Sequence, residues 1–369
     1  MTRVLHLLWE PARSGISQHV LELVRILPDL RHAVVLPAGL GGVAEELRGL
    51  GAEPHELPMR SRLLPRSALR AIPAVIRGLD PDVVHLHALE TGLFGTLAAA
   101  LGGARAIVFQ PQTVEIRQRR LLPLLRRLLR LAGRRHAAWI GVSRGQLAGL
   151  EALVPRGRVR WIPNPVPSLA PAPPRAEARA RLGWPADAFV VVSVARLAAQ
   201  KDPLTFARAA RRNPGLLHVL VGDGPLRAEV EACAREAPQL RLQGQVRGLS
   251  DVLAGADVLC LASRWEGLSL TLLEALARGV PAVASAIDGN TDAVIHERTG
   301  LLVPPGDPAA LARAIARLHA DPALRARLAL AGQAHVAETF SGPVVAAQLR
   351  ALYAEVSAEP AVEAPRGPG

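Results

Sequence analysis

Lysine is almost absent from this chain of 369 residues: Lys201 is the only one, and every other residue among the 44 basic ones is arginine. Arginine presents a planar fork of donors, whereas lysine is a compact charge on a flexible stem. A chain that uses arginine elsewhere would lose an idle lysine, so Lys201 is a candidate functional residue. The alternative is a solvated surface lysine.

Cysteine, aromatic residues and long apolar runs are also scarce. Cys233 and Cys260 match no disulfide framework or metal-ligand spacing and predict reduced, structural thiols in a cytosolic protein. An aromatic content of 3% argues against stacked-base recognition of single strands. No stretch reaches the roughly 18 uninterrupted apolar residues of a membrane span. The apolar run at the start is too short for a signal peptide and predicts a strand.

What the chain does contain favours two α/β domains. Its length is too great for one ordinary core, and half of its residues are hydrophobic. The net charge of +12 permits nucleic acid, an anionic membrane or a phosphorylated substrate as a partner. Composition does not choose among these three.

Short apolar runs alternate with helical patterns throughout, which predicts two doubly wound parallel sheets facing each other across a cleft. We expect strands at residues 4–8, 33–37, 82–87, 106–110, 138–142 and 159–163, and a second series at 189–195, 217–222, 240–244, 257–262, 281–286 and 300–304. The predicted domains are 1–165, a proline-rich linker over 166–186, and 187–340. A helix over 341–356, which can cross back to the first domain, and a disordered tail over 357–369 follow.

Parallel sheets bind ligands beyond the carboxyl ends of their strands, so the residues that follow strands are the candidate site. Arg196 and Lys201 follow the strand at 189–195 and suit a phosphate. Gly222 lies in the glycine loop "VGDGPL", a weak signal by itself. Glu266 lies in the loop after the strand at 257–262, and Glu274 lies eight residues later on a helix from about Leu270. The alternative is that Glu266 is a loop charge and Glu274 ordinary helix-start chemistry.

Two further segments bring backbone amides toward an anion. The helix from Leu270 points its free N–H groups toward the predicted cleft. The first strand leads into "PARSGISQHV", where Ser14 and Gly15 precede a helix.

Two motifs resemble metal sites. "DPD" (80–82) mimics an Asp-x-Asp metal motif, but it precedes a strand and so lies at the wrong end of the sheet; we interpret it as a turn. His85 and His87 alternate on the strand at 82–87. A metal site there needs further ligands, and packed histidines are the favoured interpretation.

A basic amphipathic segment covers residues 117–135. Leu121, Leu122, Leu125, Leu128 and Leu129 recur at helical spacing, and the arginines Arg119, Arg120, Arg126, Arg127, Arg130 and Arg134 fall largely opposite. Such a helix can lie on an anionic membrane surface. The alternative, slightly favoured for the leucines, is that they pack onto the sheet while the arginines are solvated.

Four segments of the second half, in order and spacing, resemble the second domain of family 4 retaining glycosyltransferases, which have the GT-B fold. These are "VARLAAQKD", "VGDGPLRAEVE", "EGLSLTLLEALARGVPAVAS" and "TGLLVPPGDPAALARAI". "VLHLLWEPARSGISQHVLEL", "PDVVHLH" and "IPNPV" resemble the first domain more loosely. The resemblance covers nearly the whole chain, and the ordered set is far more specific than any one motif.

The resemblance implies a role for each matching residue. Arg196 and Lys201 would hold the diphosphate of a nucleotide-sugar donor, Glu266 would approach the transferred sugar, and Glu274 would bind the ribose. Amides around Gly267, Leu268 and Ser269, and those of Leu270 and Thr271, would contact sugar and phosphates. Gly15 would come near the phosphates when the cleft closes, and Gly222 belongs to the same donor-binding set.

The chain departs from the family pattern at three places. The usual glycine pair of the first loop is Ser14–Gly15, and Gln112 stands where a histidine is often found, so we name no catalytic base there. The usual Gly-Gly-x-x-Glu loop reads "DGNTD" (288–292), with Asp292 as a shorter acid. Acceptor recognition is thus less specified than donor binding.

The sequence therefore predicts a retaining, metal-independent glycosyltransferase of hexosyltransferase type, without a cofactor or a nucleic-acid partner. Its acceptor would be a lipid-linked, glycan or small-metabolite hydroxyl, and the protein would be cytoplasmic, with possible peripheral membrane attachment. The alternatives are a phosphorylase-like enzyme carrying pyridoxal phosphate on Lys201, a sugar-nucleotide epimerase, and a basic nucleic-acid-binding protein. The first would show a pyridoxal absorbance band, and the ordered anion sites argue against the last.

Overall fold

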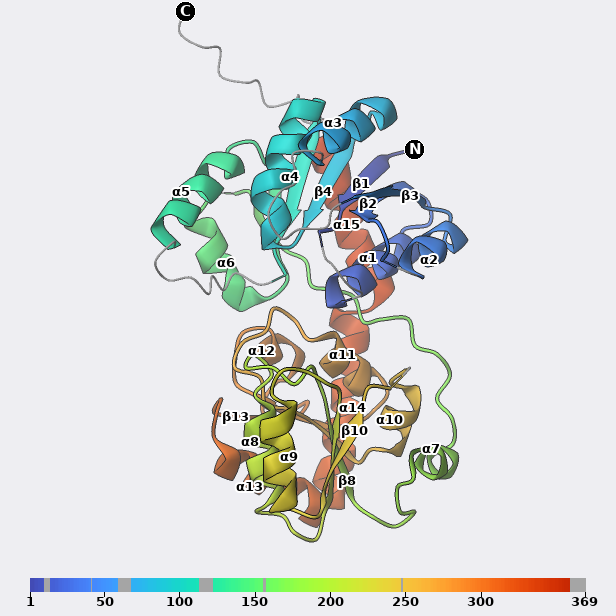
Figure 1. The fold of residues 1–369 in the computed structure, drawn as a ribbon, viewed down its shortest axis with the longest axis vertical. Helices are drawn as coiled ribbons and strands as arrows, with labels where there is room; N and C mark the ends of the chain where they lie inside the picture. The colour runs from blue at the N-terminus through green and yellow to red at the C-terminus, as the bar shows by residue number, and fades with distance from the viewer. Residues whose placement is uncertain are drawn as a thin grey trace, which may run out of the picture. The chain divides into compact units, whose positions relative to one another are not determined.

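The computed structural model describes residues 1–9, 14–40, 42–58, 68–112, 122–154, 157–246 and 248–358. For residues 89–90 and 122–126 it describes the backbone alone. The chain divides into two compact units (Figure 1). The first unit is Met1–Pro165 together with the segment that begins at Gly342, and the second is Val166–Ser341.

The first unit is built on a seven-stranded parallel sheet with the order β3-β2-β1-β4-β5-β6-β7. Its strands are β1 (Arg3–Leu7), β2 (Arg31–Pro37), β3 (Glu53–Leu57), β4 (Val83–His87), β5 (Ala106–Gln110), β6 (Ala138–Gly141) and β7 (Val159–Trp161). The predicted strands agree with these within two residues at each end. β3 was not predicted, because its sequence, "EPHEL", contains a proline and two acids, which only an edge strand tolerates.

Helices cover both faces of this sheet. They are α1 (Gly15–Ile26), α2 (Val43–Gly49), α3 (Ala68–Leu79), α4 (Leu89–Gly102), α5 (Leu122–Gly133), α6 (Arg144–Glu151) and α15 (Gly342–Ala358). Residues of α3, α4 and α5 share one apolar cluster with alternate residues of β1, β2 and β4. Residues of α1, α2 and α15 pack against the other set of alternate residues, as the two-residue period of a strand requires.

The C-terminal helix α15 belongs to the core of the first unit, although it follows the second unit in the sequence (Figure 1). Val345, Leu349 and Tyr353 are buried in one cluster with Val4 of β1. The Tyr353 hydroxyl also lies 2.8 Å from Nδ1 of His85 on β4. Helix α15 therefore completes the first unit.

The second unit has a six-stranded parallel sheet with the order β10-β9-β8-β11-β12-β13. Its strands are β8 (Val190–Val194), β9 (Leu217–Val221), β10 (Leu240–Gly244), β11 (Val258–Leu261), β12 (Ala282–Ser285) and β13 (Leu301–Val303). Its helices are α7 (Arg175–Leu182), α8 (Pro203–Ala210), α9 (Arg227–Arg235), α10 (Ser250–Gly255), α11 (Leu270–Ala277), α12 (Asn290–Ala293), α13 (Pro308–Ala320) and α14 (Pro322–Thr339). Residues of α8, α9, α13 and α14 form one cluster with the sheet.

Part of the predicted linker over 166–186 is regular structure, which corrects that expectation. Residues Arg175–Leu182 form α7, which packs against α10. Arg179 is 3% exposed and donates to Gly255 O at 3.0 Å and to the carboxylate of Asp257 at 2.8 Å. Because these partners satisfy a buried guanidinium, the proline-rich sequence does not prevent α7 from joining the second unit.

Candidate active site

Four loops at the carboxyl ends of β8, β9, β11 and β12 pack together in the second unit, and two glycines permit their close approach. A Cβ at Gly222 would lie 2.0 Å from Ala195 O, and one at Gly289 would lie 1.8 Å from Gly267 O. Both glycines have positive φ, of 136° and 81°. Other residues would clash there, so the glycines of "VGDGPL" and "DGNTD" assemble the loops.

Lys201 and Glu266 meet within this assembly. Nζ of Lys201 donates to Oε1 of Glu266, and the Ser263 hydroxyl donates to the same oxygen at 2.7 Å. The side chain of Lys201 is 22% exposed and that of Glu266 is 7% exposed. The lone lysine therefore lies at a partly buried, charge-paired position, and not on a solvated surface.

Arg196 follows β8 as the sequence predicted, and its side chain is exposed. Ala195 N donates to Val221 O at 3.0 Å, and Leu197 N donates to Asp223 O at 2.9 Å. These bonds fix the backbone on both sides of Arg196 against the loop that carries Gly222. The arginine is held by its backbone while its guanidinium faces solvent.

Helix α11 begins at Leu270, as predicted, and Ser269 is its N-cap. The Ser269 hydroxyl accepts from Leu272 N at 3.4 Å. Gly267 and Leu268 precede the cap and are buried, whereas Leu270 and Thr271 are partly exposed in the first turn. The predicted amide set thus surrounds a helix N-terminus, where the backbone carries a partial positive charge.

Glu274 is the fifth residue of α11 and pairs with Arg278, one turn later, at 3.4 Å. Burial raises the pKa of the Glu274 carboxyl, and the neighbouring Arg278 partly opposes this. Glu274 accepts from Arg278, whereas Glu266 accepts from Lys201. The structure therefore links the first predicted acid to the lysine and leaves the second on the helix face.

Gly15 lies in the other unit, as the first residue of α1. Ser14 is the N-cap of α1, and its side chain accepts from Ile16 N at 3.0 Å. Among the described residues beyond its chain neighbours and its own helix, none has an atom within 4 Å of a Cβ built at Gly15. The loop that differs from the family's glycine pair therefore forms a regular capping box.

Gln112 ends a directional chain of side chains in the first unit. His19 Nε2 lies 3.0 Å from Gln110 Oε1, Gln110 Nε2 donates to Asn164 Oδ1 at 3.4 Å, and Asn164 Nδ2 donates to Gln112 Oε1 at 2.8 Å. The amide oxygen of Gln112 is thus engaged as an acceptor. Its buried Nε2 has no hydrogen-bond partner among the described residues.

His85 and His87 are fully buried, which confirms the packed interpretation, and the pairing of β1 with β4 adds His6. Ring nitrogens of His6, His85 and His87 lie within 4.8 Å of one another, as metal ligands can. However, His32 Nε2 donates to Leu27 O at 2.9 Å, so its Nδ1 accepts from His6 Nε2, at 3.1 Å.

His6 Nδ1 then accepts from His87 Nε2 at 3.0 Å. Burial lowers the pKa of all four rings, which keeps them neutral. Both nitrogens of His6 are thereby occupied, and this hydrogen-bonded chain does not offer the lone pairs of a three-histidine metal site.

The second apparent metal motif, residues 80–82, lies between α3 and the start of β4, at the end of the sheet that the sequence predicted. Asp80 and Asp82 precede β4, and Asp82 accepts from Arg3 N at 2.8 Å. Asp80 pairs with Arg105. Both acids therefore bind the amino ends of the strands.

Helix α5 covers the later half of the predicted basic segment. The structure does not describe residues 113–121, which include Arg119 and Arg120, or the side chain of Arg126. Arg127 and Arg130 are exposed, and Leu129 is 1% exposed. Leu128 was expected to pack and is 42% exposed, and Leu131 is 62% exposed. Of the predicted leucines whose side chains the structure describes, Leu129 is therefore buried and Leu128 is exposed.

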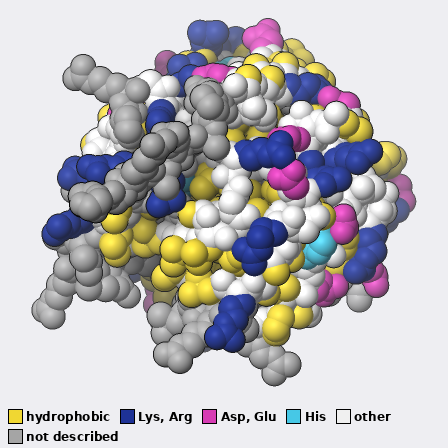
Figure 2. Space-filling view, turned by 90° about the horizontal axis from the view of Figure 1, so that it is seen from above, with side chains coloured by type: hydrophobic (Ala, Val, Ile, Leu, Met, Phe, Trp, Pro, Cys, Tyr) yellow, Lys and Arg dark blue, Asp and Glu magenta, His cyan; other side chains and the backbone are white. Residues whose placement is uncertain are grey.

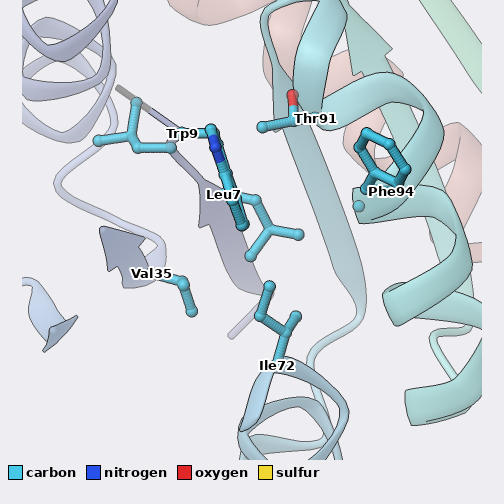
Figure 3. Close-up of a pocket in the computed structure, with 8 residues that line it drawn as sticks. Leu7, Trp9, Val35, Ile72, Thr91 and Phe94 are labelled. Atoms are coloured by element: carbon cyan, nitrogen blue, oxygen red, sulfur yellow. The ribbon is translucent and has the colours of Figure 1, made fainter. Parts of the chain in front are cut away.

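An apolar pocket lies at the carboxyl ends of β1 and β2 in the first unit (Figure 3). Leu7, Trp9, Val35, Ile72 and Phe94 contribute to its lining, with Thr91 as the polar residue. Phe94 is 40% exposed, and Leu97 and Leu101 continue along α4 from it, at 49% and 56%. This spacing places the three side chains on one face of the helix.

Sequence reasoning missed four residues that hold the predicted ones: Asp202, Ser263, Arg264 and Arg278. Asp202 carried a signal, since an acid before a proline marks a helix N-cap. Arg278 also carried a signal, because it follows Glu274 by four residues on one helix. Ser263 contacts Glu266 within one loop and Arg264 contacts Asp202 of another loop, and no local pattern specifies either contact.

Two parallel-sheet Rossmann-like units with this arrangement of loops define the GT-B class of glycosyltransferases. The model described as Glycosyltransferase Family 4 matches residues 13–168, and the model described as Glycosyl transferases group 1 matches residues 174–335. Together they span most of the sequence. The chain belongs to the family 4 type of glycosyltransferases.

Relatives in two other organisms agree with this class. The chain is 26% identical over 344 residues to the UDP-Gal:alpha-D-GlcNAc-diphosphoundecaprenol alpha-1,3-galactosyltransferase of Escherichia coli, covering 87% of this chain and 89% of that protein. It is 37% identical to the lipopolysaccharide core biosynthesis glycosyltransferase LpsD of Rhizobium meliloti, over 46% of this chain and 50% of that protein. The second match therefore spans only half the length of each.

The fold also matches solved structures. HepE of Anabaena, in complex with UDP-glucose, has a TM-score of 0.82 at 18% identity, covering 96% of this chain and 100% of that one. At this identity the match shows the shared fold. None of the helices within the described ranges combines the length and the hydropathy that a membrane-spanning segment needs.

Proposed function

We propose that this glycosyltransferase moves a hexose from a nucleoside-diphosphate donor to a hydroxyl acceptor, with retention and without a metal. The observation that carries the proposal is the contact between Lys201 and the 7%-exposed Glu266, beside an α-helix N-terminus. A cation, a carboxylate and the amides of a helix N-terminus lie together at the carboxyl ends of neighbouring strands. Such groups can bind a charged leaving group and a sugar. The solved complex of HepE with UDP-glucose supports a nucleotide-sugar donor for this fold.

The residues have separate roles in this mechanism. Lys201 and Arg196 bind the diphosphate and stabilise its charge as it departs, replacing the metal that other folds use. When the donor binds, its diphosphate replaces Glu266 as the ionic partner of Lys201. Glu266 then lies beside the transferred sugar. Glu274 binds the ribose, and the amides from Gly267 to Thr271, with those near Gly222, complete the donor set of the second unit.

No enzymic nucleophile is needed in this scheme. The acceptor hydroxyl attacks on the face that the leaving group occupies, its oxygen bonds to the anomeric carbon as the carbon–phosphate oxygen bond breaks, and the departing phosphate oxygen takes the proton. Glu266 stabilises the positive charge that develops on the sugar.

The experiment is a mass-spectrometric screen of nucleotide sugars for transfer or hydrolysis, with Glu266→Gln and Glu274→Gln alongside. Glu274→Gln should mainly weaken binding of the bare nucleoside diphosphate in calorimetry, since the ribose is held equally in ground and transition states. Glu266→Gln should mainly lower turnover. Equal loss of nucleotide affinity in both variants, or no nucleotide sugar consumed by the wild type, would contradict the proposal.

We further propose a lipid-linked acceptor, met by the first unit at the cytoplasmic face of a membrane. Exposed Phe94, Leu97 and Leu101 extend from the apolar pocket, and exposed Leu128 and Leu131 lie on α5 with Arg127 and Arg130. Figure 2 shows basic side chains spread beside hydrophobic areas on one face of the protein. The diphosphoundecaprenol-linked acceptor in the name of the Escherichia coli relative supports this choice.

A further inference from the structure

Three contacts join the loop after β8 to the loop after β11, apart from the pair formed by Lys201 and Glu266. Nε of Arg264 donates to Oδ2 of Asp202 at 3.0 Å. Arg264 N donates to Gln200 O at 2.8 Å, and Gln200 Nε2 donates to Trp265 O at 3.2 Å. The residues that make these contacts are next to Lys201 in one loop and lie just before Glu266 in the other.

Asp202 is the residue on which this connection depends. Its φ of 42° and ψ of 57° are left-handed, a conformation that aspartate adopts more readily than most side chains do. It is 4% exposed, and its carboxylate accepts from Thr205 N at 3.3 Å and Thr205 Oγ1 at 2.9 Å. One buried carboxylate therefore caps α8 and accepts from Arg264 of the neighbouring loop.

Arg264 has a different environment. Its side chain is 57% exposed, whereas that of Asp202 is 5% exposed. A single ion pair of this kind contributes little to global stability. The pair nevertheless joins the two loops that carry Lys201 and Glu266, beside the bond from Arg264 N to Gln200 O at 2.8 Å.

We propose that Asp202 and Arg264 are positioning residues, and that their ion pair holds the two loops at the separation at which Lys201 reaches Glu266. The proposal rests on the function proposed above. When a bound diphosphate pairs with Lys201, Lys201 no longer contacts Glu266. The ion pair between Asp202 and Arg264 remains and keeps the two loops at the same separation. Loss of this ion pair should therefore change turnover more than nucleotide affinity.

The single lysine allows a direct test. Lysine labelled with ¹³C and ¹⁵N, in a protein whose purification tag lacks lysine, gives NMR side-chain signals from Lys201 alone. Glu266→Gln defines the chemical shift of the released lysine. Arg264→Gln and Asp202→Asn should move the Lys201 signal toward that position.

Asp202→Asn is chosen because asparagine also tolerates the left-handed conformation and caps helices. If that variant does not fold, the Arg264→Gln variant at an exposed side chain still decides the question. The control is Arg317→Gln, which breaks the exposed ion pair with Glu297 in the same unit. It should leave the signal unchanged.

Activity supplies the second readout. Arg264→Gln should lower kcat about tenfold, because a small misplacement of reacting groups has an effect of this size. The Kd for UDP should stay within about twofold of the wild-type value. A wild type that transfers no sugar would contradict the proposed function. The Lys201 signal tests the positioning role of the ion pair between Asp202 and Arg264 separately, because it does not depend on turnover. An unmoved Lys201 signal in Arg264→Gln, or a Kd for UDP raised as much as kcat falls, would overturn the positioning role.

Discussion

At the scale of single residues, Nζ of Lys201 lies against a carboxylate that also accepts from Ser263. Glu266 is 7% exposed at its side chain, so the cation beside it has little room. A guanidinium is wider and planar, and its fork suits two oxygens better than one. Shape as well as charge therefore distinguishes lysine from arginine here.

Lys201→Arg should accordingly keep the fold and the net charge and lose transfer activity by roughly 100-fold, the usual scale for a displaced charge-stabilising group. The measurement is steady-state transfer with the donor found in the screen, beside a thermal melt. The control is Arg317→Lys, the reverse exchange at an exposed position. Normal turnover in Lys201→Arg would mean that the solitary lysine is an accident of composition.

At the scale of elements, α5 presents arginines and leucines together. Leu129 packs into the core, while Leu128 and Leu131 are exposed near Arg127 and Arg130. A helix with exposed apolar and basic side chains binds anionic lipid through both. The membrane contact proposed for the first unit should therefore depend on salt and on these side chains.

Sedimentation with anionic liposomes checks this. Wild type should bind at low salt and dissociate as salt rises, since each basic residue near an anionic surface contributes about 1 kcal/mol that salt screens. Arg126→Gln, Arg127→Gln and Arg130→Gln combined should release the protein, and Arg317→Gln in the second unit should not. A wild type that ignores anionic liposomes at low salt would favour a soluble acceptor.

At the scale of the whole molecule, more histidines with a lowered pKa are buried in the described part of the first unit than in that of the second. Burial lowers the pKa of His19 to about 4 and that of His85 to about 3, and it also lowers those of His6, His32 and His87. In the second unit His218 is buried, with its pKa lowered to about 4. Between pH 6.5 and about 4 the unfolded chain binds protons that the folded first unit does not.

The first unit should therefore be fully stable above pH 6.5 and lose stability as the pH falls toward 4. At pH 5 one such histidine costs about 2 kcal/mol, and several act together. Hydrogen exchange at pH 7.5 and pH 5, corrected for intrinsic rates, should show β1 and β4 losing protection while β8 and β11 lose less. Equal protection loss in both units would contradict this assignment.

Much of the fold was determined locally. Apolar runs of five to seven residues between helical patterns predicted all but one strand, since a buried parallel strand needs both faces apolar. The exception, β3, lies at a sheet edge, where pairing with β2 and not its own residues makes it a strand. α7 was likewise missed, because buried partners for Arg179 come from the distant residues Gly255 and Asp257.

The candidate site divides in the same way. Sequence alone determined which residues follow the strands of the second sheet, because glycines, a lone lysine and two acids occur there at fixed spacing. Only the tertiary structure decided that Lys201 meets Glu266, that Asp202 accepts from Arg264, and that His6 joins His87. These pairs are separated by 62 to 81 residues, and a side-chain contact across such a distance depends on strand order and loop packing, which no local pattern specifies.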